Sequence, residues 1–306
     1  MYWYWGKKIF KEYLNLVSEG MIDDLHLYDI NSNILTDEIF HGLNVVIHDS
    51  YQSLIDAVDA IHICVPNNFH YEYALRSITA GVSTMIEKPL TKDSIEAFNL
   101  VELALEYKVV LQVGNIFRFS NSLNIAREMI KNGTIGSINH ISLLWTHMAP
   151  SDNSKAEDAL WDLGPHIFDI LNFLTGSWPL STIYNSNQHY GLSERQYQTE
   201  LIEDYGNFTS RIRMSLIDHR KARIIEISGT LGTVIIDPVN QKIDFYSDKG
   251  MSHVEVEKNN TLRDEILNFI ECSKSGRTRI NSGNLGAAIV RILENIEEVP
   301  KNETKS

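Results

Sequence analysis

Residues Met85–Leu90 read Met-Ile-Glu-Lys-Pro-Leu and close a short apolar run that starts at Thr84. Such a run is typical of a parallel strand that is buried on both faces. A strand of this kind tolerates a lysine only where the chain leaves the sheet, and Pro89 ends the strand directly after Lys88. Because α/β proteins bind ligands at the carboxyl edge of a parallel sheet, Lys88 is a candidate site residue. The alternative is a surface lysine whose stem covers apolar surface.

The sequence around this stretch alternates short apolar runs with helical patterns over the first 115 residues. The other apolar runs are Leu25–Asp29, Asn44–Ile47, Ala60–Pro66 (AIHICVP) and Val109–Gly114 (VVLQVG). The clearest helical pattern follows Ser94, a candidate N-cap, with apolar residues at i, i+3, i+4, i+7 and i+8 from Ala97. Strand, helix and strand at this spacing predict a parallel, Rossmann-type sheet with right-handed crossovers.

A second pattern, dominated by strands, begins near residue 135. The expected strands are Ile135–Trp145, Ser181–Tyr184, Tyr205–Leu216, Arg223–Ser228, Thr233–Asp237, Lys242–Tyr246 and His253–Val256, and the expected helices are 165–175, Leu262–Ser273 and Leu285–Glu297. Apolar and polar residues alternate within Phe208–Leu216, as in a half-buried antiparallel strand. Gly229–Gly232 is expected to form a hairpin loop. We therefore predict an α/β chain, with a Rossmann-like dinucleotide-binding domain over residues 1–118 and an α+β domain with a large, mainly antiparallel sheet over residues 119–306.

Composition narrows the class of protein. A chain of 306 residues is long enough for two domains with separate cores. The net charge of −13 argues against nucleic acid and anionic membranes as partners. Cys64 and Cys272 are too few for a disulfide framework and lack zinc-site spacing, which favours a cytoplasmic location. No run approaches the roughly 18 apolar residues of a membrane span, and the first residues do not resemble a signal peptide.

The stretch Leu160–Gly176 (LWDLGPHIFDILNFLTG) carries an aspartate and a histidine four positions apart. Pro165 suits the first turn of a helix and Gly176 suits its C′ position. Asp162 is then expected just before the helix and His166 within its first turn. A histidine whose charge is tuned by a neighbouring carboxylate is a suitable general acid/base near pH 7. The alternative is a capping aspartate beside a core histidine with satisfied hydrogen bonds.

Asp29 ends the first recognisable strand, 23 positions after Gly6. In dinucleotide folds an acid at this place binds the adenosine ribose hydroxyls and disfavours a 2′-phosphate. The residue therefore points to NAD rather than NADP. A turn or helix-capping aspartate is the alternative, and Asn31-Ser32 keep it open.

The first residues do not contain the G-x-G-x-x-G loop that normally joins a strand to a helix. If Gly6 is the third glycine, Met1 and Trp3 occupy the first two positions. The strand before the loop, which is the central strand of the usual sheet, is then missing. The indole of Trp3 is expected to hinder close approach of the backbone to a pyrophosphate. A numbered chain that starts at an internal methionine would account for this pattern.

Three motifs in order, Ala60–Pro66 with His70, Glu87-Lys88-Pro89, and Asp162-x-Gly164-x-His166, resemble the Gfo/Idh/MocA family of NAD(P)-dependent sugar oxidoreductases. The resemblance runs from Trp5-Gly6-Lys7 through Leu262-x-x-Glu265 to the last helix. Tyr4–Lys7 is similar to the end of a glycine-loop variant found in nucleotide-sugar dehydrogenases. The resemblance implies hydride transfer between NAD and the carbon of a ring hydroxyl in a sugar or nucleotide sugar.

The resemblance also implies roles for single residues. Lys88 orients the reacting hydroxyl and lowers its pKa, His166 is the acid/base, and Asp162 positions the substrate or His166. The implied cofactor contacts are Trp5, Gly6, Asp29, Val65, Pro66, Asn67, His70, Glu87, Lys88 and Asn115. The implied substrate contacts are Lys88, Arg118, Asp162 and His166, with Arg118 facing an anionic substrate. Specificity is expected from the strands of the second domain and from the Trp145–Trp161 loop, including His147, and no metal is expected.

Two further expectations concern the whole protein. The resemblance implies a homodimer or homotetramer joined through the C-terminal sheet, whose face is partly polar at Arg211 and Arg213. The rival to the enzyme hypothesis is a cofactor-poor relative that binds a ligand or a partner subunit. The atypical glycine loop motivates this rival, whereas the joint presence of Lys88, Asp162 and His166 favours the enzyme.

Overall fold

The computed structural model describes residues 2–31, 45–148, 157–189, 196–278 and 280–299, which form two compact units. The first unit comprises Met1–Gly114 and Leu262–Ala288, and the second comprises Asn115–Thr261 and Ile289–Ser306. The sequence placed the boundary at 118/119 and did not foresee the return of residues 262–288 to the first unit. Expected features at Met1, Ser32, Asn44 and residues 149–156 lie outside the described residues. Within the described ranges, no helix combines the length and the apolar character needed to cross a membrane.

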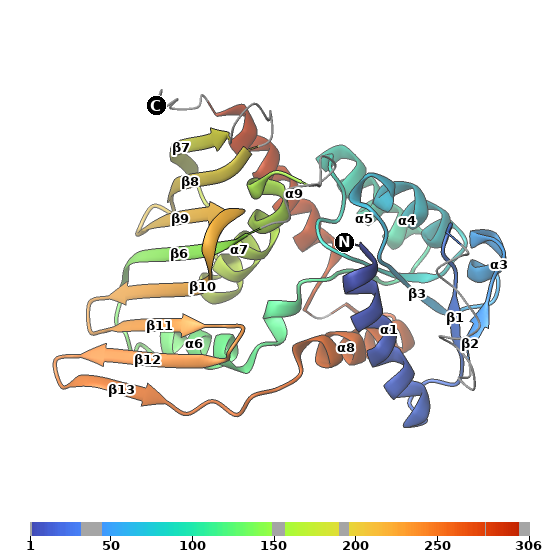
Figure 1. Cartoon of the computed structure of the whole chain (residues 1–306), viewed down its shortest axis with the longest axis horizontal. Helices are drawn as coiled ribbons and strands as arrows, with labels where there is room; N and C mark the ends of the chain where they lie inside the picture. Colours follow the sequence, from blue (N-terminus) through green and yellow to red (C-terminus); the bar gives the residue numbers. More distant parts are fainter. Residues whose placement is uncertain (1, 32–44, 149–156, 190–195, 279, 300–306) are drawn as a thin grey trace. The chain divides into compact units, whose positions relative to one another are not determined.

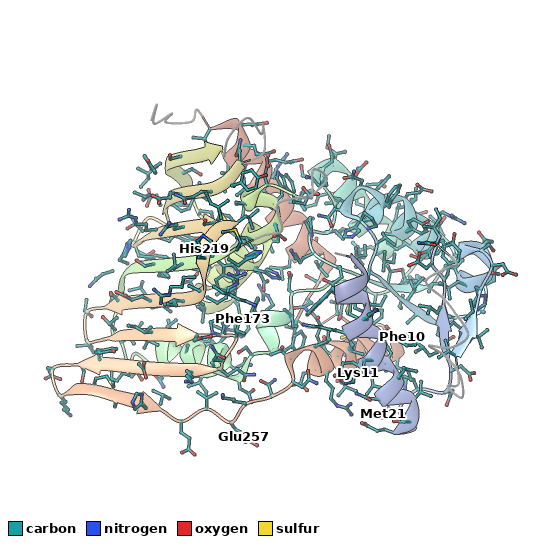
Figure 2. All side chains as sticks on the ribbon, viewed as in Figure 1. Phe10, Lys11, Met21, Phe173, His219 and Glu257 are labelled. Carbon is teal, nitrogen blue, oxygen red and sulfur yellow. The ribbon has the colours of Figure 1, made fainter. Side chains whose placement is uncertain are left out.

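The first unit is built from short parallel strands and helices (Figure 1). Its elements are α1 (Tyr2–Ser18), β1 (Leu25–Leu27), β2 (Val45–Ile47), α3 (Tyr51–Ile55), β3 (Ala60–Ile63), η2 (Asn67–Phe69), α4 (His70–Thr79), β4 (Ser83–Ile86), α5 (Ser94–Glu106), β5 (Leu111–Val113) and α8 (Thr261–Ser275). Phe10 and Lys11 mark α1 in Figure 2. Each expected strand is present but shorter than its apolar run. The expected N-cap of α5 is corrected from Ser94 to Asp93, whose side chain accepts a hydrogen bond from Glu96 N at 3.0 Å.

The described strands of the first unit pair as two parallel sheets, β1-β2 and β3-β4-β5. This pairing confirms the parallel architecture that the alternation predicted. Among the described strands, none pairs with both β1 and β3. All four residues of β4 are buried because the strand is flanked on both sides.

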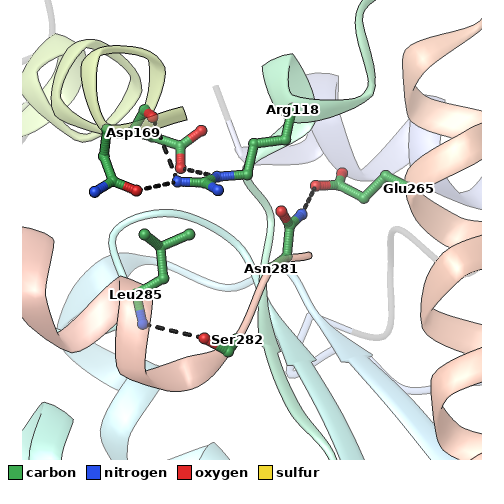
Figure 3. Close-up of polar contacts among 7 residues, drawn as sticks. Arg118, Asp169, Glu265, Asn281, Ser282 and Leu285 are labelled. Carbon is green, nitrogen blue, oxygen red and sulfur yellow. Dashed lines mark hydrogen bonds and ion pairs between the residues drawn. The ribbon is translucent and has the colours of Figure 1, made fainter. Parts of the chain in front are cut away.

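The chain after α8 packs against the outer edge of β5. Val113 N donates to Asn281 O at 3.1 Å, and Gln112 forms an isolated antiparallel bridge with Ser282. The Asn281 side chain donates to Glu265 Oε1 on α8 at 2.9 Å (Figure 3). Backbone groups on a sheet edge are otherwise open to pairing with other chains, so this contact protects the edge of β5.

The second unit is organised around one eight-stranded sheet with the order β13-β12-β11-β10-β6-β9-β8-β7 (Figure 1). Its strands are β6 (Ile138–Met148), β7 (Ser181–His189), β8 (Gln196–Asp204), β9 (Thr209–Ser215), β10 (Ile217–Gly229), β11 (Thr233–Asp237), β12 (Lys242–Ser247) and β13 (Gly250–Val254). Its helical elements are η3 (Ile116–Phe119), α6 (Asn121–Lys131), α7 (Ala159–Thr175) and the second part of α9 (Gly283–Glu298). All pairs are antiparallel except β6 with β9, which confirms the mainly antiparallel sheet.

One face of this sheet is covered by α6 and α7 and carries the core of the unit (Figure 1). Trp145, Ile212 and Ile225 point to this face and are fully buried. The alternation in β9 is confirmed, because Ile212 and Met214 are buried whereas Arg211 on the other face is exposed. The expected hairpin at Gly229–Gly232 is also confirmed, with Gly229 N donating to Gly232 O at 2.9 Å.

The expected start of the helix at Pro165 is wrong. Helix α7 begins at Ala159 after the N-cap residue Asp158, and Pro165 lies inside it. Leu160, Trp161 and Leu163 are buried, so packing extends the helix nearly two turns before the proline. The C-terminus is as expected, because Gly176 takes a left-handed conformation with φ of 70°. Strand β8 was not expected from the sequence, and β6 is shifted by three residues relative to Ile135–Trp145.

Candidate functional site

Glu87 and Lys88 directly follow the last residue of β4, at the carboxyl end of the central strand of its sheet. The chain turns there through a cis Lys88–Pro89 peptide. Lys88 is half-buried, and Glu87 is buried with 9% of its surface exposed. The strand was expected to end at Lys88 and ends two residues earlier, at Ile86, so both charged residues lie just beyond it at the edge where α/β folds bind ligands.

The carboxylate of Glu87 is held in place by neighbours in the first unit. Its Oε1 lies 3.4 Å from His62 Nε2, and Tyr13 Oη lies 3.4 Å from His62 Nδ1. Burial by itself raises the pKa of Glu87, but its contacts with His62, and to a lesser degree with Trp5 and Lys88, outweigh burial and lower the pKa. A Cβ on Gly114 would lie 3.0 Å from this carboxylate, so a larger residue there would require the Glu87 side chain to shift.

Val65, Pro66 and Asn67 follow β3 at the same edge of the sheet and are half-exposed. His70 is fully buried, and its two ring nitrogens face Pro89 O at 2.7 Å and Val65 O at 3.0 Å. Since it has no exposed surface, His70 supports the segments after β3 and β4 rather than contacting a ligand through its own ring.

The remaining cofactor positions have distinct surroundings. Asp29 lies two residues after β1 and accepts a hydrogen bond from Asn31 N at 2.8 Å, as the turn alternative requires. Trp5 and Gly6 lie within α1, and Trp5 helps to lower the pKa of Glu87. Asn115, the first residue of the second unit, is 1% exposed, and neither side-chain amide atom has a hydrogen-bond partner among the described residues.

Asp162 and His166 lie one helical turn apart on α7, both within the second unit. They are half-exposed, whereas Leu163, Gly164 and Pro165 between them are buried. The rings of Phe117 and His166 meet edge to face at 5.2 Å between centroids, and Phe117 meets Trp145 in the same way at 5.3 Å. The helix thus presents an acid and an imidazole on one face beside an aromatic wall.

Arg118 has an internal partner. Its Nε donates to Asp169 Oδ1 at 2.5 Å and its Nη2 donates to Asn172 Oδ1 at 2.9 Å (Figure 3). Its guanidinium also lies over Phe173, 5.3 Å from the ring centroid. Burial raises the pKa of Asp169 to about 6, although Arg118 lowers it in part. This network gives Arg118 a structural partner, and its proposed contact with an anionic substrate has no support in the described geometry.

Arg223 on β10, which was not singled out from the sequence, lies near Asp162 in the second unit. Its guanidinium lies over the Trp145 ring, 5.1 Å from the centroid, and its Nη2 is 3.1 Å from His147 Nδ1. Burial lowers its pKa to about 10, and the charge of Asp162 opposes this shift. Arg223 is in phase with Ile225 and Ile227, which are fully buried, so a charged residue at a core-facing position of an alternating strand was the signal that the sequence offered.

The proposed catalytic residues are divided between the units, with Lys88 in the first and Asp162 and His166 in the second. Over the described residues, no group of three or more His, Cys, Asp or Glu side chains could hold a metal ion.

Two family profiles match this chain. One is described as "Oxidoreductase family, NAD-binding Rossmann fold" and matches residues 27–115, and the other is the GFO/IDH/MocA C-terminal domain and matches residues 123–235. Inositol 2-dehydrogenase of Corynebacterium glutamicum (strain R) is 34% identical over 147 residues, which are 45% of this chain and 43% of that protein. UDP-N-acetylglucosamine 3-dehydrogenase of Acidithiobacillus ferrooxidans is 32% identical over 132 residues, 43% of this chain and 40% of that protein. The match spans less than half the length of these curated relatives.

A solved structure shows the same fold over most of the chain. A crystal form of UDP-N-acetylglucosamine 3-dehydrogenase GnnA from Acidithiobacillus ferrooxidans matches with a TM-score of 0.79 and 22% identity, covering 89% of this chain and 88% of that one. The two profile matches span both the parallel strands and the large sheet. The chain belongs to the Gfo/Idh/MocA oxidoreductase family.

Proposed function

We propose that this protein is an NAD-dependent dehydrogenase that transfers a hydride between NAD and the carbon of a ring hydroxyl in a sugar or nucleotide sugar. One observation carries the proposal: Asp162 and His166 stand one turn apart and half-exposed on α7, in a chain whose first unit matches an NAD-binding family. The names of the relatives, an inositol dehydrogenase and a nucleotide-sugar dehydrogenase, support a cyclic polyol or sugar as the substrate class.

The residues proposed to hold the cofactor fit a dinucleotide at its nicotinamide end. The buried Asn115 amide has hydrogen-bonding capacity that the described residues do not satisfy, and such a group is costly unless a ligand or water pairs with it. Glu87 is kept ionised at the end of β4 and suits the hydroxyls of a ribose. Asp29 at the end of β1 suits the adenosine ribose and favours NAD over NADP.

In this proposal three side chains handle the proton of the substrate hydroxyl. When bound, the nicotinamide ring supplies the hydride acceptor or donor. The Lys88 ammonium orients the substrate hydroxyl and stabilises its alkoxide, and the His166 imidazole takes the hydroxyl proton in the oxidative direction. Asp162, one turn before His166, positions the imidazole or the substrate.

The first test is a titration of the full chain with NAD and NADH, by calorimetry or by quenching of its five tryptophans. Micromolar binding supports the proposal, and a panel of sugars and nucleotide sugars then follows. No binding at millimolar NADH contradicts it and favours the second candidate, a family member that binds a ligand or partner without the cofactor.

Lys88→Ala then tests the mechanism. We expect turnover to fall by about 10²–10⁴-fold while NADH affinity is nearly unchanged, since Lys88 acts mainly on the reacting hydroxyl. Lys249→Ala, at an exposed lysine between β12 and β13, is the matched control and should change neither quantity. A mild effect of Lys88→Ala on turnover removes Lys88 from the mechanism.

We also propose that the protein assembles through the face of the eight-stranded sheet that α6 and α7 leave uncovered. Strand pairing puts Leu144 beside Ile224 on this face, and Ile202 and Ile235 share it. These four side chains are only half-buried within one chain. Arg213 makes ion pairs there with Glu200 at 3.6 Å and Asp218 at 3.5 Å, which gives the face a polar part. A second copy of the chain would bury the apolar residues, in a homodimer or homotetramer.

A further inference from the structure

Arg223 is anchored in the second unit by groups that do not neutralise its charge. Its Nη1 donates to the backbone oxygens of Thr146 at 2.7 Å and Ala222 at 2.9 Å. Its Nη2 donates to His147 Nδ1 at 3.1 Å, which makes Nδ1 the acceptor nitrogen of that imidazole. These contacts use three of the five N–H donors of a guanidinium. Within the described residues, the Nε–H and one Nη2 hydrogen therefore have no acceptor.

Arg223 and Arg118 differ in their partners. Arg118 forms an ion pair with Asp169, whose carboxylate is almost fully buried. Arg223 forms no ion pair with a carboxylate among the described residues, and Asp162 acts on it only as a nearby charge. A partly desolvated cation without a paired anion is costly, and an oxyanion that accepts the two remaining hydrogens would offset that cost. With a pKa of about 10, Arg223 stays charged at neutral pH.

The position of Arg223 connects it to the proposed acid/base. Its pairing partner in β6 is Trp145, which is fully buried on the helix-covered face of the sheet. A row of ring contacts then leads from the guanidinium through Trp145 and Phe117 to His166. A continuous row of rings thus joins the guanidinium to the imidazole within the second unit, and the charge of Asp162, one turn before His166, acts on Arg223.

We propose that Arg223, braced by His147 and stacked on Trp145, binds an anionic group of the substrate. This inference rests on the proposed dehydrogenase function and narrows its substrate class to sugars that carry a phosphate, a diphosphate or a carboxylate, rather than neutral polyols. A guanidinium presents donors in a planar fork that matches the oxygens of either kind of anion. The Arg118 assignment made from the sequence is thereby replaced by Arg223.

The experiment compares Arg223→Met with the parent protein. Methionine keeps an unbranched stem over Trp145 and removes the charge. Inorganic phosphate, pyrophosphate, glucose 6-phosphate, glucuronate and glucose serve as probes, each titrated by tryptophan fluorescence with and without NADH. We expect affinity for at least one class of anionic probe to fall by about 10–100-fold, the usual range for a charge-assisted hydrogen bond, with little change for glucose. The phosphate probes and glucuronate tell the two sources of the anion apart.

Two further variants test whether the effect is specific to Arg223 and whether it depends on the shape of the guanidinium or on its charge alone. Arg220→Met removes an exposed arginine from the same strand and should leave every affinity unchanged. Arg223→Lys keeps the charge but loses the fork, so it should retain part of the anion affinity, and it also serves if Arg223→Met fails to fold. Equal affinities of parent, Met and Lys variants for every anionic probe would overturn the inference.

The outcomes separate this inference from the proposed function. If NADH does not bind but Arg223→Met loses phosphate or glucuronate binding, the anion site stands and the dehydrogenase function falls. If NADH binds and an anionic sugar is bound and oxidised as well by Arg223→Met as by the parent, the dehydrogenase function stands and the anion site falls.

Discussion

His166 and Asp162 are the two half-exposed side chains of a helical turn whose other residues are buried. We expect His166→Asn to lower the turnover number by about 10²–10⁴-fold and to flatten the acidic limb of the pH–rate profile, because asparagine cannot accept the hydroxyl proton. The measurement is kcat/KM against pH with the best substrate from the sugar panel. His219→Asn, at an exposed histidine of β10 labelled in Figure 2, is the control and should keep the parent profile. An unchanged acidic limb in His166→Asn would assign the base to another residue.

Glu203 on β8 predicts a pH dependence of stability. It is 1% exposed, and its carboxyl accepts from Thr182 Oγ1 at 3.0 Å and 3.2 Å. Burial raises its pKa from 4.5 to about 8, partly opposed by the Thr182 hydrogen bond. Because the folded pKa is the higher one, the contribution of this group to stability is complete below pH 4.5 and is lost as the pH rises towards 8. Between pH 4.5 and about pH 8, the free energy of unfolding falls by up to about 1.4 kcal/mol per pH unit because of this group.

Urea unfolding between about pH 5 and 9 tests this expectation, because that range brackets the interval in which only the unfolded state is ionised. Glu203→Gln should flatten the decline and should be more stable than the parent protein near the folded pKa of about 8, since glutamine stays neutral. Glu226→Gln, at an exposed carboxylate of β10, should follow the parent curve. If the free energy of unfolding changes with pH in the same way for Glu203→Gln and the parent, Glu203 is already ionised in the folded state.

The surroundings of some candidate site residues could be predicted from the sequence, and those of others could not. Lys88 was predictable because a buried strand admits a charged side chain only where it leaves the sheet, and Glu87-Lys88 do follow β4. The partner of Arg118 was not predictable, because Asp169 lies 51 positions away and only the fold brings the two together. Arg223 takes a position that the alternation in β10 assigns to buried residues, because Ile225 and Ile227 share its phase. The role proposed for it depends on stacking over Trp145, which lies on another strand.

Among the elements, the β10–β11 hairpin supplies a stability prediction. A Cβ on Gly229 would lie 2.2 Å from Ile135 O and 3.1 Å from Ser137 O, both backbone atoms that cannot move aside without shifting the chain. We expect Gly229→Ala to lower the free energy of unfolding by about 1–3 kcal/mol, as other overpacked substitutions do. Gly6→Ala in α1 is a contrasting control, because its Cβ meets only Cys64 Sγ at 4.0 Å, and alanine favours a helix by up to about 1 kcal/mol. Urea midpoints measure both, and an undiminished midpoint for Gly229→Ala would show that residues 135–137 can yield.

The residues at which helices and strands begin and end depended on tertiary packing, which the pattern of apolar and polar residues indicated only in part. Strand β11 matched its expected limits because polar residues and turns flank its apolar alternation. Helix α7 began earlier than Pro165 suggested, since the preference of proline for a first turn is overridden where Leu160, Trp161 and Leu163 all gain burial. Strand β8 escaped notice because charged and polar residues, from Gln196 to Asp204, occupy most of its length.

For the whole molecule, the uncovered face of the eight-stranded sheet predicts self-association. We expect light scattering after size exclusion to give a dimer or tetramer at micromolar concentration, and Ile224→Glu to shift it towards the monomer by placing a charge among apolar residues. Leu231→Glu, in the exposed β10–β11 turn, should leave the mass unchanged. A monomeric parent protein at micromolar concentration would contradict the proposed assembly.

The two-part architecture was predictable because each sheet type imposes its own period on the sequence. Continuous apolar runs marked the parallel strands, and alternation marked the antiparallel ones. The assignment of residues 262–288 to the first unit was not predictable, because a helix looks the same in sequence whichever sheet it covers. Only tertiary contacts, such as Val113 N with Asn281 O, decide it.

Residues 262–288 belong to the first unit although they follow the large sheet in the sequence, and this order affects folding during synthesis. A ribosome releases residues 1–114 first, yet the backbone of β5 gains its second neighbour only when residues 281–282 have emerged. All strands of the large sheet precede residue 255, although the second unit also includes residues from Ile289 onwards. Nascent chains that end before residue 281 should consequently leave the edge of β5 exposed, and chaperones that shield strand edges would be needed most during that interval.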